Sequence, residues 1–344
     1  MIDSSQSSIE EVSVHIVGNA GTQEGLTLSP APLVLRDEKI RKLLLQYFLS
    51  NFQSPEYYSF TFSNDDLSLN AVRKFVQEIF AAPENFHENS IHIARHLYDV
   101  SQHPNIKAGD LYVAHLSDVV IDNQLVQAVG IFKCENKETY LKLENFDLRA
   151  DDGINLHKLD KGCLIIESAE EEEFRILVVD NANKSEAQFW KQDFLNIKPL
   201  SDAFHHTHNF MSLTRQYVSD QLDEEFSVSK ADQIDLLNRS IDFFKSREQF
   251  NKAEFESEVL GNADVIESFR NFGKTFQDRN ELDVADDFEI SVHAVKKQAR
   301  VFKSVLKLDK NFHVYIHGNR QLIEKGYDET TGKHFYKLYF DEES

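Results

Sequence analysis

Three histidines lie close together in the stretch DAFHHTHNF, where His205, His206 and His208 follow Asp202. Imidazole nitrogens are common ligands of zinc and other transition metals, so this stretch is a candidate metal site. The same pattern is typical of a helix start with Asp202 as its N-cap, and on a helix only His205 and His208 share a face. No HExxH motif or cysteine pair completes a coordination shell. We therefore favour a helix start and keep metal ligation at His205–His208 as the exception.

Other motifs of enzymes and nucleotide-binding proteins are incomplete. Gly332–Lys333 in DETTGKHF resembles the end of a P-loop, but Tyr327 and His334 stand where that motif requires glycine and Ser or Thr. We interpret this segment as a hairpin turn between two strands. No G-x-S-x-G sequence occurs, and neither Cys134 nor Cys163 has a histidine partner at motif spacing. We therefore predict a protein that is not an enzyme, with no catalytic residue and no cofactor.

Basic residues are concentrated near the end of a chain whose net charge is −21. From Ser291 onward there are 10 Lys and Arg against 7 Asp and Glu, which is a net charge of +3. The preceding residues carry 27 basic and 51 acidic side chains, a net charge of −24. This acidity excludes a protein that coats nucleic acid with its whole surface, because phosphate binding depends on Lys and Arg. Screening over about 8 Å at physiological salt still allows a local basic face to act.

The basic C-terminal region also has the alternation of β-strands. In FHVYIHG the odd-numbered residues His313, Tyr315 and His317 lie on one side, and the even-numbered residues of 312–316 form the core side. A basic face with an aromatic side chain is suited to contact phosphates and bases. A half-exposed antiparallel sheet with a basic outer face explains the pattern equally well. The candidate nucleic-acid-binding residues are Lys296, Lys297, Arg300, Lys303, Lys307, Lys310, Tyr315 and Arg320.

The spacing of apolar residues along the sequence predicts the strands and helices that position these residues. EVSVHIVG, with Val12, Val14 and Ile16 on one face, predicts a strand, and three amphipathic helices follow within residues 36–101. From Gly109 the period changes to strands with short links, which indicates antiparallel neighbours. AQFWKQDFLN predicts a short helix that carries the single tryptophan, Trp190.

Residues 202–280 have a helical period almost throughout, and the chain then returns to strands. We therefore predict an α+β protein with three regions. Residues 1–200 form an α+β domain with an antiparallel sheet, residues 201–285 a helical region, and residues 286–344 a basic C-terminal β region. These boundaries rest on the change of hydrophobic period alone.

No segment has the pattern of a membrane span or a secretion signal. The longest apolar runs, such as CLII and ILVV, are much shorter than the roughly 20 residues of a membrane helix. The N-terminal MIDSSQSS lacks the basic start and apolar run of a signal peptide. We expect a soluble, cytoplasmic protein without membrane contact.

Several blocks, in their order along most of the chain, resemble the bacterial nucleoid-associated protein family of the NdpA (YejK-like) type. These blocks are VHIVGN at 14–19, AGDLYVAHLSD at 108–118, AVGIFKCE at 128–135, LDKGCLIIES at 159–168, FRILVVDN at 174–181, AQFWKQDFLN at 187–196, FKSVLKLDKNFHVYIHG at 302–318 and GYDETTGKHFYKLYF at 326–340.

The resemblance implies a cytoplasmic bacterial protein that is found with the nucleoid. Two hypotheses for its partner follow. The first is weak DNA association without sequence preference through the basic C-terminal face. The second is an acidic adaptor that reaches the nucleoid through a bound protein and has no DNA affinity of its own.

Overall fold

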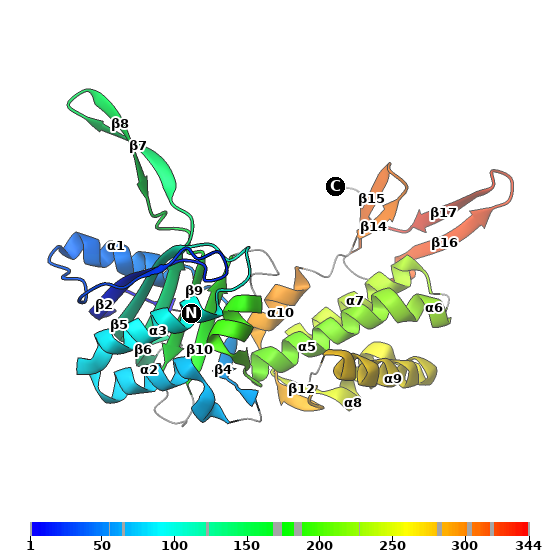
Figure 1. Cartoon of the computed structure of the whole chain (residues 1–344). Coiled ribbons are helices and arrows are strands. Elements are labelled where there is room, and N and C mark those ends of the chain that lie inside the picture. The colour runs from blue at the N-terminus through cyan, green and yellow to red at the C-terminus, as the bar shows by residue number, and fades with distance from the viewer. Residues whose placement is uncertain are drawn as a thin grey trace. The chain divides into compact units, whose positions relative to one another are not determined.

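The computed structural model describes residues 2–54, 56–63, 66–121, 124–167, 174–181, 188–226, 228–280, 284–300, 305–316 and 320–342. The chain divides into two compact units (Figure 1). Unit 1 spans Met1–Leu200 and unit 2 spans Ser201–Ser344. The architecture is α+β with antiparallel strand pairs, as the hydrophobic period predicts.

Unit 1 is built on an antiparallel sheet to which nine described strands contribute. Their order is β11-β4-β10-β9-β6-β5-β2-β3, and β1 pairs with β5. The strands are β1 (Ile2–Asp3), β2 (Ser8–Val17), β3 (Leu26–Thr27), β4 (Tyr57–Phe60), β5 (Gly109–Ile121), β6 (Gln124–Cys134), β9 (Lys161–Ile166), β10 (Arg175–Asp180) and β11 (Ile197–Pro199). The long central strands β5 and β6 pair with each other from Asp110–Cys134 to Ile121–Gln124.

Both faces of this sheet are covered by helices. The core on one face joins Leu111 and Val113 of β5 to α2 (Ala71–Ala81), α3 (Phe86–Val100) and the π-helix η4 (Phe189–Leu195). The core on the other face joins Tyr112 and Ala114 to α1 (Glu38–Leu49). Successive residues of a strand point to opposite faces, so β5, β6 and β9 are apolar on both sides. Unit 1 therefore has three layers.

Asn70 fixes the start of α2 to its neighbours. Its Oδ1 accepts the Arg73 N–H at 2.9 Å, which is an N-cap bond. Its Nδ2 lies 3.0 to 3.1 Å from the carbonyl oxygens of Thr61, Leu195 and Asn196. Two 3-10 turns, η2 (Leu67–Leu69) and η3 (Pro83–Asn85), precede α2 and α3. One buried amide side chain thus joins α2 to the ends of β4 and η4.

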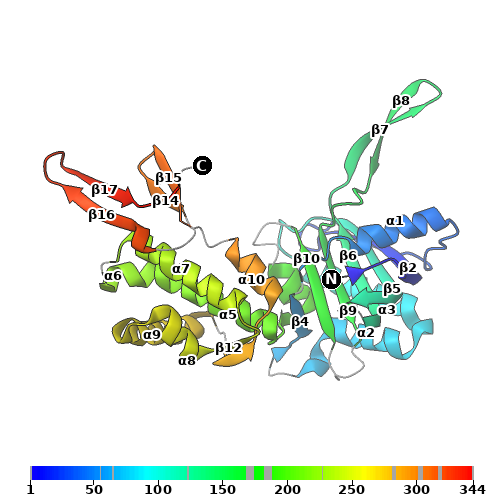
Figure 2. The same cartoon turned by 180° about the vertical axis from the view of Figure 1, so that it is seen from behind.

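Strands β7 (Glu138–Glu144) and β8 (Asp147–Gly153) pair only with each other in the described sheets. They form a hairpin between β6 and β9 that projects from unit 1 in both views (Figure 1, Figure 2). Every residue from 138 to 152 is exposed. We call this hairpin the arm.

Unit 2 has a helical body with an aromatic core. Its elements are α5 (Ala203–Gln216), η5 (Tyr217–Gln221), α6 (Leu222–Phe226), α7 (Lys230–Lys245), β12 (Gln249–Asn251), α8 (Lys252–Phe255), η6 (Glu256–Leu260), α9 (Ala263–Asn280), β13 (Asp287–Glu289) and α10 (Val292–Ala299). Phe250 lies at the centre, 4.3 Å from the ring of Phe210, 5.3 Å from Phe244 and 4.5 Å from Phe288 between ring centroids. Clustered aromatic rings of this kind hold the helices and the β12–β13 pair together.

Two hairpins complete unit 2, β14 (Val305–Leu308) with β15 (Phe312–Tyr315) and β16 (Ile323–Asp328) with β17 (Lys333–Leu338). The 3-10 turn η7 (Arg320–Leu322) precedes β16. Leu306, Ile316 and Ile323 pack with Ala231 and Ile234 of α7. The hairpins are therefore anchored to the N-terminal half of α7.

The structure adds detail to the predicted elements. Ile16 shares a face of β2 with Val12 and Val14 but is 52% exposed near the end of the strand. Phe312, expected in the core, is 64% exposed near the hairpin turn. The short helix predicted around Trp190 is the π-helix η4, Phe189–Leu195, with Trp190 fully buried. The predicted turn at Gly332 is confirmed, and its φ of 66° is one that glycine readily adopts.

Apolar residues on both sides of the predicted boundary at 285 share one core in unit 2. Val284, Phe288 and Val295 belong to the same apolar cluster as Phe210 and Phe244. The division into a helical and a separate C-terminal region stays a prediction.

Two fully buried lysines share one carboxylate at the root of the arm. Lys133 of β6 and Lys161 of β9 are directly opposite in the sheet. Their Nζ atoms lie 3.1 Å from Glu135 Oε1 and 2.9 Å from Glu135 Oε2. Lys133 Nζ also donates to the Lys107 carbonyl at 2.6 Å. Asp160 accepts the Glu135 N–H at 2.7 Å, so the two chain segments that flank the arm are tied together.

Polar side chains also join α3 to β2 inside the core. His15 Nδ1 accepts the Ser29 N–H at 3.2 Å, so Nε2 carries the proton and donates to Ser90 Oγ at 3.1 Å. Ser13 Oγ and His87 Nδ1 lie 2.8 Å apart. Burial, with a smaller contribution from His87, lowers the pKa of His15 to about 4. The folded protein therefore holds His15 in its neutral form.

We expect Glu135→Gln to destabilise unit 1 by about 3–5 kcal/mol, because it removes the carboxylate from two buried ammonium groups. Urea unfolding followed by the fluorescence of Trp190, the only tryptophan, reports on this unit. The matched control is Lys137→Gln, whose half-exposed ion pair with Asp110 should contribute less than about 1 kcal/mol. Equal losses in the two variants would contradict a buried network that holds the fold.

The buried, neutral His15 makes the stability of unit 1 depend on pH. The unfolded state binds a proton at His15 below about pH 6.5, whereas the folded state resists it down to a pKa of about 4. The contribution of His15 to the free energy of unfolding is complete above about pH 6.5. It is lost as the pH falls from there to the folded-state pKa of about 4. The slope is at most about 1.4 kcal/mol per pH unit. Unfolding free energies of His15→Gln should lack this slope, while the control His92→Gln, on the exposed side of α3, should keep it. Parallel pH profiles for wild type and His15→Gln would refute the assignment.

Candidate nucleic-acid interface

The β14–β15 hairpin presents a polar outer face and an apolar inner face. Lys307 is directly opposite His313, and Val305 is opposite Tyr315. Lys307, His313 and Tyr315 are exposed, and the Tyr315 side chain is 64% accessible. Leu306 packs against α7 on the inner face. The hairpin thus holds an ammonium group, an imidazole and a phenol ring side by side in solvent.

Lys310 lies in the turn of the same hairpin. It follows Asp309, which adopts a left-handed backbone with a φ of 51°. Asp tolerates this conformation better than most residues do. Lys310 is exposed at the tip, next to the one acidic residue of the stretch 301–320. The turn therefore adds a second exposed ammonium group to the hairpin.

Helix α10 and its C-cap carry three more of the candidate nucleic-acid-binding cations on their outer side. Ser291 caps the helix by accepting the Ala294 N–H. Lys296, Lys297 and Arg300 are exposed, whereas the opposite side is buried against α5, where Gln298 Nε2 donates to Ser212 Oγ at 2.9 Å. Residues four apart share a helix face, so Lys296 and Arg300 are neighbours.

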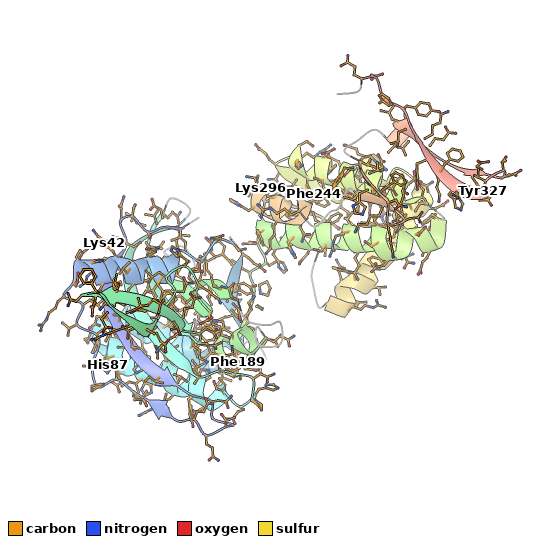
Figure 3. All side chains as sticks on the ribbon, turned by 90° about the horizontal axis from the view of Figure 1, so that it is seen from above. Lys42, His87, Phe189, Phe244, Lys296 and Tyr327 are labelled. Carbon is orange, nitrogen blue, oxygen red and sulfur yellow. The ribbon has the colours of Figure 1, made fainter. Side chains whose placement is uncertain are left out.

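The predicted residues fall into two groups along α7. Helix α10 and strand β14 both contact α7, and β14 lies over its N-terminal half. Figure 3 shows Lys296 beside Phe244, near the C-terminal end of α7, and Tyr327 at the far end of this unit. Lys303 and His317 lie outside the described residues, and Arg320 is placed only as the first residue of η7.

The β16–β17 hairpin adds basic and aromatic residues that the sequence analysis did not select. Lys325 is directly opposite Tyr336, and Tyr327 is opposite His334 with ring centroids 5.0 Å apart. Lys333 lies at the start of β17 and is exposed. The stretch KHFYKLYF could have predicted this arrangement. Every second side chain of a strand lies on one face, which places His334 beside Tyr336.

The histidine stretch forms a helix start. Asp202 Oδ1 accepts the His205 N–H at 2.9 Å, which confirms the N-cap. His205 Nε2 is 2.8 Å from Asn209 Nδ2, and His206 Nε2 is 3.2 Å from Ser201 Oγ. Within the parts of the chain that the structure describes, no group of three or more His, Cys, Asp or Glu side chains is arranged to hold a metal ion.

Comparison with known proteins identifies the family. A family model described as nucleoid-associated protein YejK matches residues 13–335. No curated protein matches the chain significantly. Among the described residues, no helix combines the length and the apolar character that crossing a bilayer requires. The family match extends over most of both units, includes the β14–β15 hairpin and ends within β17. The chain therefore belongs to the nucleoid-associated protein YejK family.

Proposed function

We propose that this protein associates with DNA in the cytoplasm, weakly and without sequence preference, through the exposed cations of α10 and of the β14–β15 hairpin. The observation that carries the proposal is the two-sided β14–β15 hairpin. Its inner leucine is buried on α7, while Lys307, Lys310 and Tyr315 are exposed on the same hairpin. Membership of a nucleoid-associated family supports the choice of DNA as the ligand.

The chemistry of these side chains accounts for weak, non-specific contact. Lysine ammonium groups bind phosphate oxygens as point charges and read no base edge. Four to six neutralised phosphates give a log–log salt slope of about −4 to −5. The affinity then falls by roughly 10²- to 10³-fold between about 50 and 200 mM salt. The net charge of −24 on residues 1–290 opposes binding, which keeps the association weak.

Charge reversal tests this proposal. We expect Lys307→Glu with Lys310→Glu, and separately Lys296→Glu with Arg300→Glu, to weaken DNA binding and to flatten the salt slope by about one for each lost contact. The measurement is fluorescence anisotropy of a labelled duplex at several salt concentrations. The matched control is Lys39→Glu with Lys42→Glu, two exposed lysines on α1 of unit 1. Figure 3 labels Lys42 on this helix. This control adds the same negative charge elsewhere and should change the slope little.

An unchanged slope in both C-terminal variants would refute the interface. If the purified wild-type protein does not bind DNA even at low salt, the adaptor hypothesis takes its place. The acidic residues 1–290 favour that alternative, because they are suited to a basic protein partner. A partner that stays bound after nuclease treatment would support the adaptor, and loss of all partners on digestion would exclude it.

A further inference from the structure

The arm is an amphipathic ribbon with an uncovered apolar face. Residues that are directly opposite in an antiparallel pair point to the same side. Leu143 is opposite Leu148, and Leu141 is opposite Ala150, so these four side chains form one face. The three leucines are 61–69% exposed. A contiguous apolar surface of this kind on a projecting element marks a contact site.

The opposite face of the arm collects most of its charges. Lys142 is opposite Arg149, and Glu144 is opposite Asp147. Lys142 pairs with Glu144, and Arg149 Nε lies 3.3 Å from Asp147 Oδ2. The two faces therefore differ as sharply as the two sides of a sheet that packs on a core. An isolated two-stranded hairpin is only marginally stable in water.

The tip ends in an exposed aromatic ring. Asn145 and Phe146 both have a left-handed backbone, with φ values of 50° and 65°. This is the two-residue hairpin turn in which the second position favours glycine. Phe146 occupies that position, and its ring is fully exposed at 101%. The ring thus lies where the backbone is unfavourable for phenylalanine, and no residue in the described part of the chain covers it.

We propose that the arm is a self-association element, and that its apolar face packs against the same face of the arm of a second copy. Two copies of a chain with a net charge of −21 repel each other wherever acidic surfaces meet. Among its paired residues, the apolar face has one charged side chain, Asp152. It lies at the base of the arm, where it accepts a hydrogen bond from Thr139. Face-to-face contact therefore turns the other arm charges away from the partner. A basic partner would instead be attracted to the charged face.

The shape of the face is also self-complementary. A two-fold contact requires that a residue and its partner exchange places between the copies. With the arms antiparallel, the Leu143–Leu148 pair of each copy packs over the Leu141–Ala150 pair of the other, so a bulky row meets a row that contains alanine. Phe146 at the tip then reaches the base of the partner arm.

The size of the apolar face limits the affinity that the dimer can have. Seven residues per strand give a ribbon about 24 Å long and, with two strands, about 10 Å wide. This is less than the roughly 800 Å² per partner of a standard interface. We therefore expect a weak, reversible dimer with a dissociation constant no tighter than the micromolar range.

Sedimentation velocity of the full chain over a concentration series tests the proposal. The wild-type protein should pass from monomer to dimer, and Leu143→Thr with Leu148→Thr should weaken the dimer at least about tenfold, because two apolar contacts are lost. Threonine suits a strand, so the hairpin can persist. The matched control is Lys142→Thr with Arg149→Thr, a pair in the neighbouring rung of the other face, which should dimerise like the wild type.

A third variant separates association from folding. Phe146→Gly suits the turn better, so it should stabilise the hairpin and still weaken the dimer. A wild-type protein that stays monomeric at every concentration overturns the proposal. So does a dimer that tolerates both the leucine pair and Phe146→Gly, or one that the charged-face control disrupts equally. Tight binding of the arm by a different protein, with the wild type alone remaining monomeric, would assign the face to that partner instead.

Discussion

The buried carboxylate of Glu135 is the constraint on which the arrangement of unit 1 depends. The central strands are covered on both faces, so a charged side chain at their ends has no direct path to water. Lys133 lies near the end of β6 and Lys161 at the start of β9 in this environment, and one carboxylate contacts both. A charge pair of this kind adds little stability compared with an apolar core, but it penalises every register that separates its members. It thereby specifies how β6 and β9 align.

The same network determines where the arm leaves the sheet. Glu135 and Asp160 flank the arm in the sequence, and Asp160 accepts backbone hydrogen bonds from Glu135 and Asn136. The two chain segments are therefore fixed at the root, while residues 138–152 extend into solvent. A rigid root with an exposed ribbon suits an element that meets a partner. If the arm joins two copies, each particle carries two basic surfaces, and bivalent contact strengthens an association that is weak for one copy.

Unit 2 exposes several cations on a chain that is acidic overall. The aromatic core around Phe250 fixes α5 and α7, and α7 in turn supports α10 and the β14–β15 hairpin. Apolar residues on the inner faces leave Lys296 and Lys307 in solvent. Screening limits the range of the electrostatic field of each cation, so the local potential at these elements depends on nearby charges more than on the net charge of the chain.

Features that depend on near neighbours along the chain could be predicted from the sequence. Asp202 as an N-cap, the turn at Gly332 and the alternation around Leu306 all follow from local backbone geometry and period. Which lysines are buried and which leucines are exposed could be learned from the three-dimensional packing alone. Lys133 is buried because β5 and β9 flank it and helices cover its face, whereas Leu143 is exposed because its strand pairs with one neighbour alone. Burial depends on strand register and layer packing between distant segments, and no local pattern contains that information.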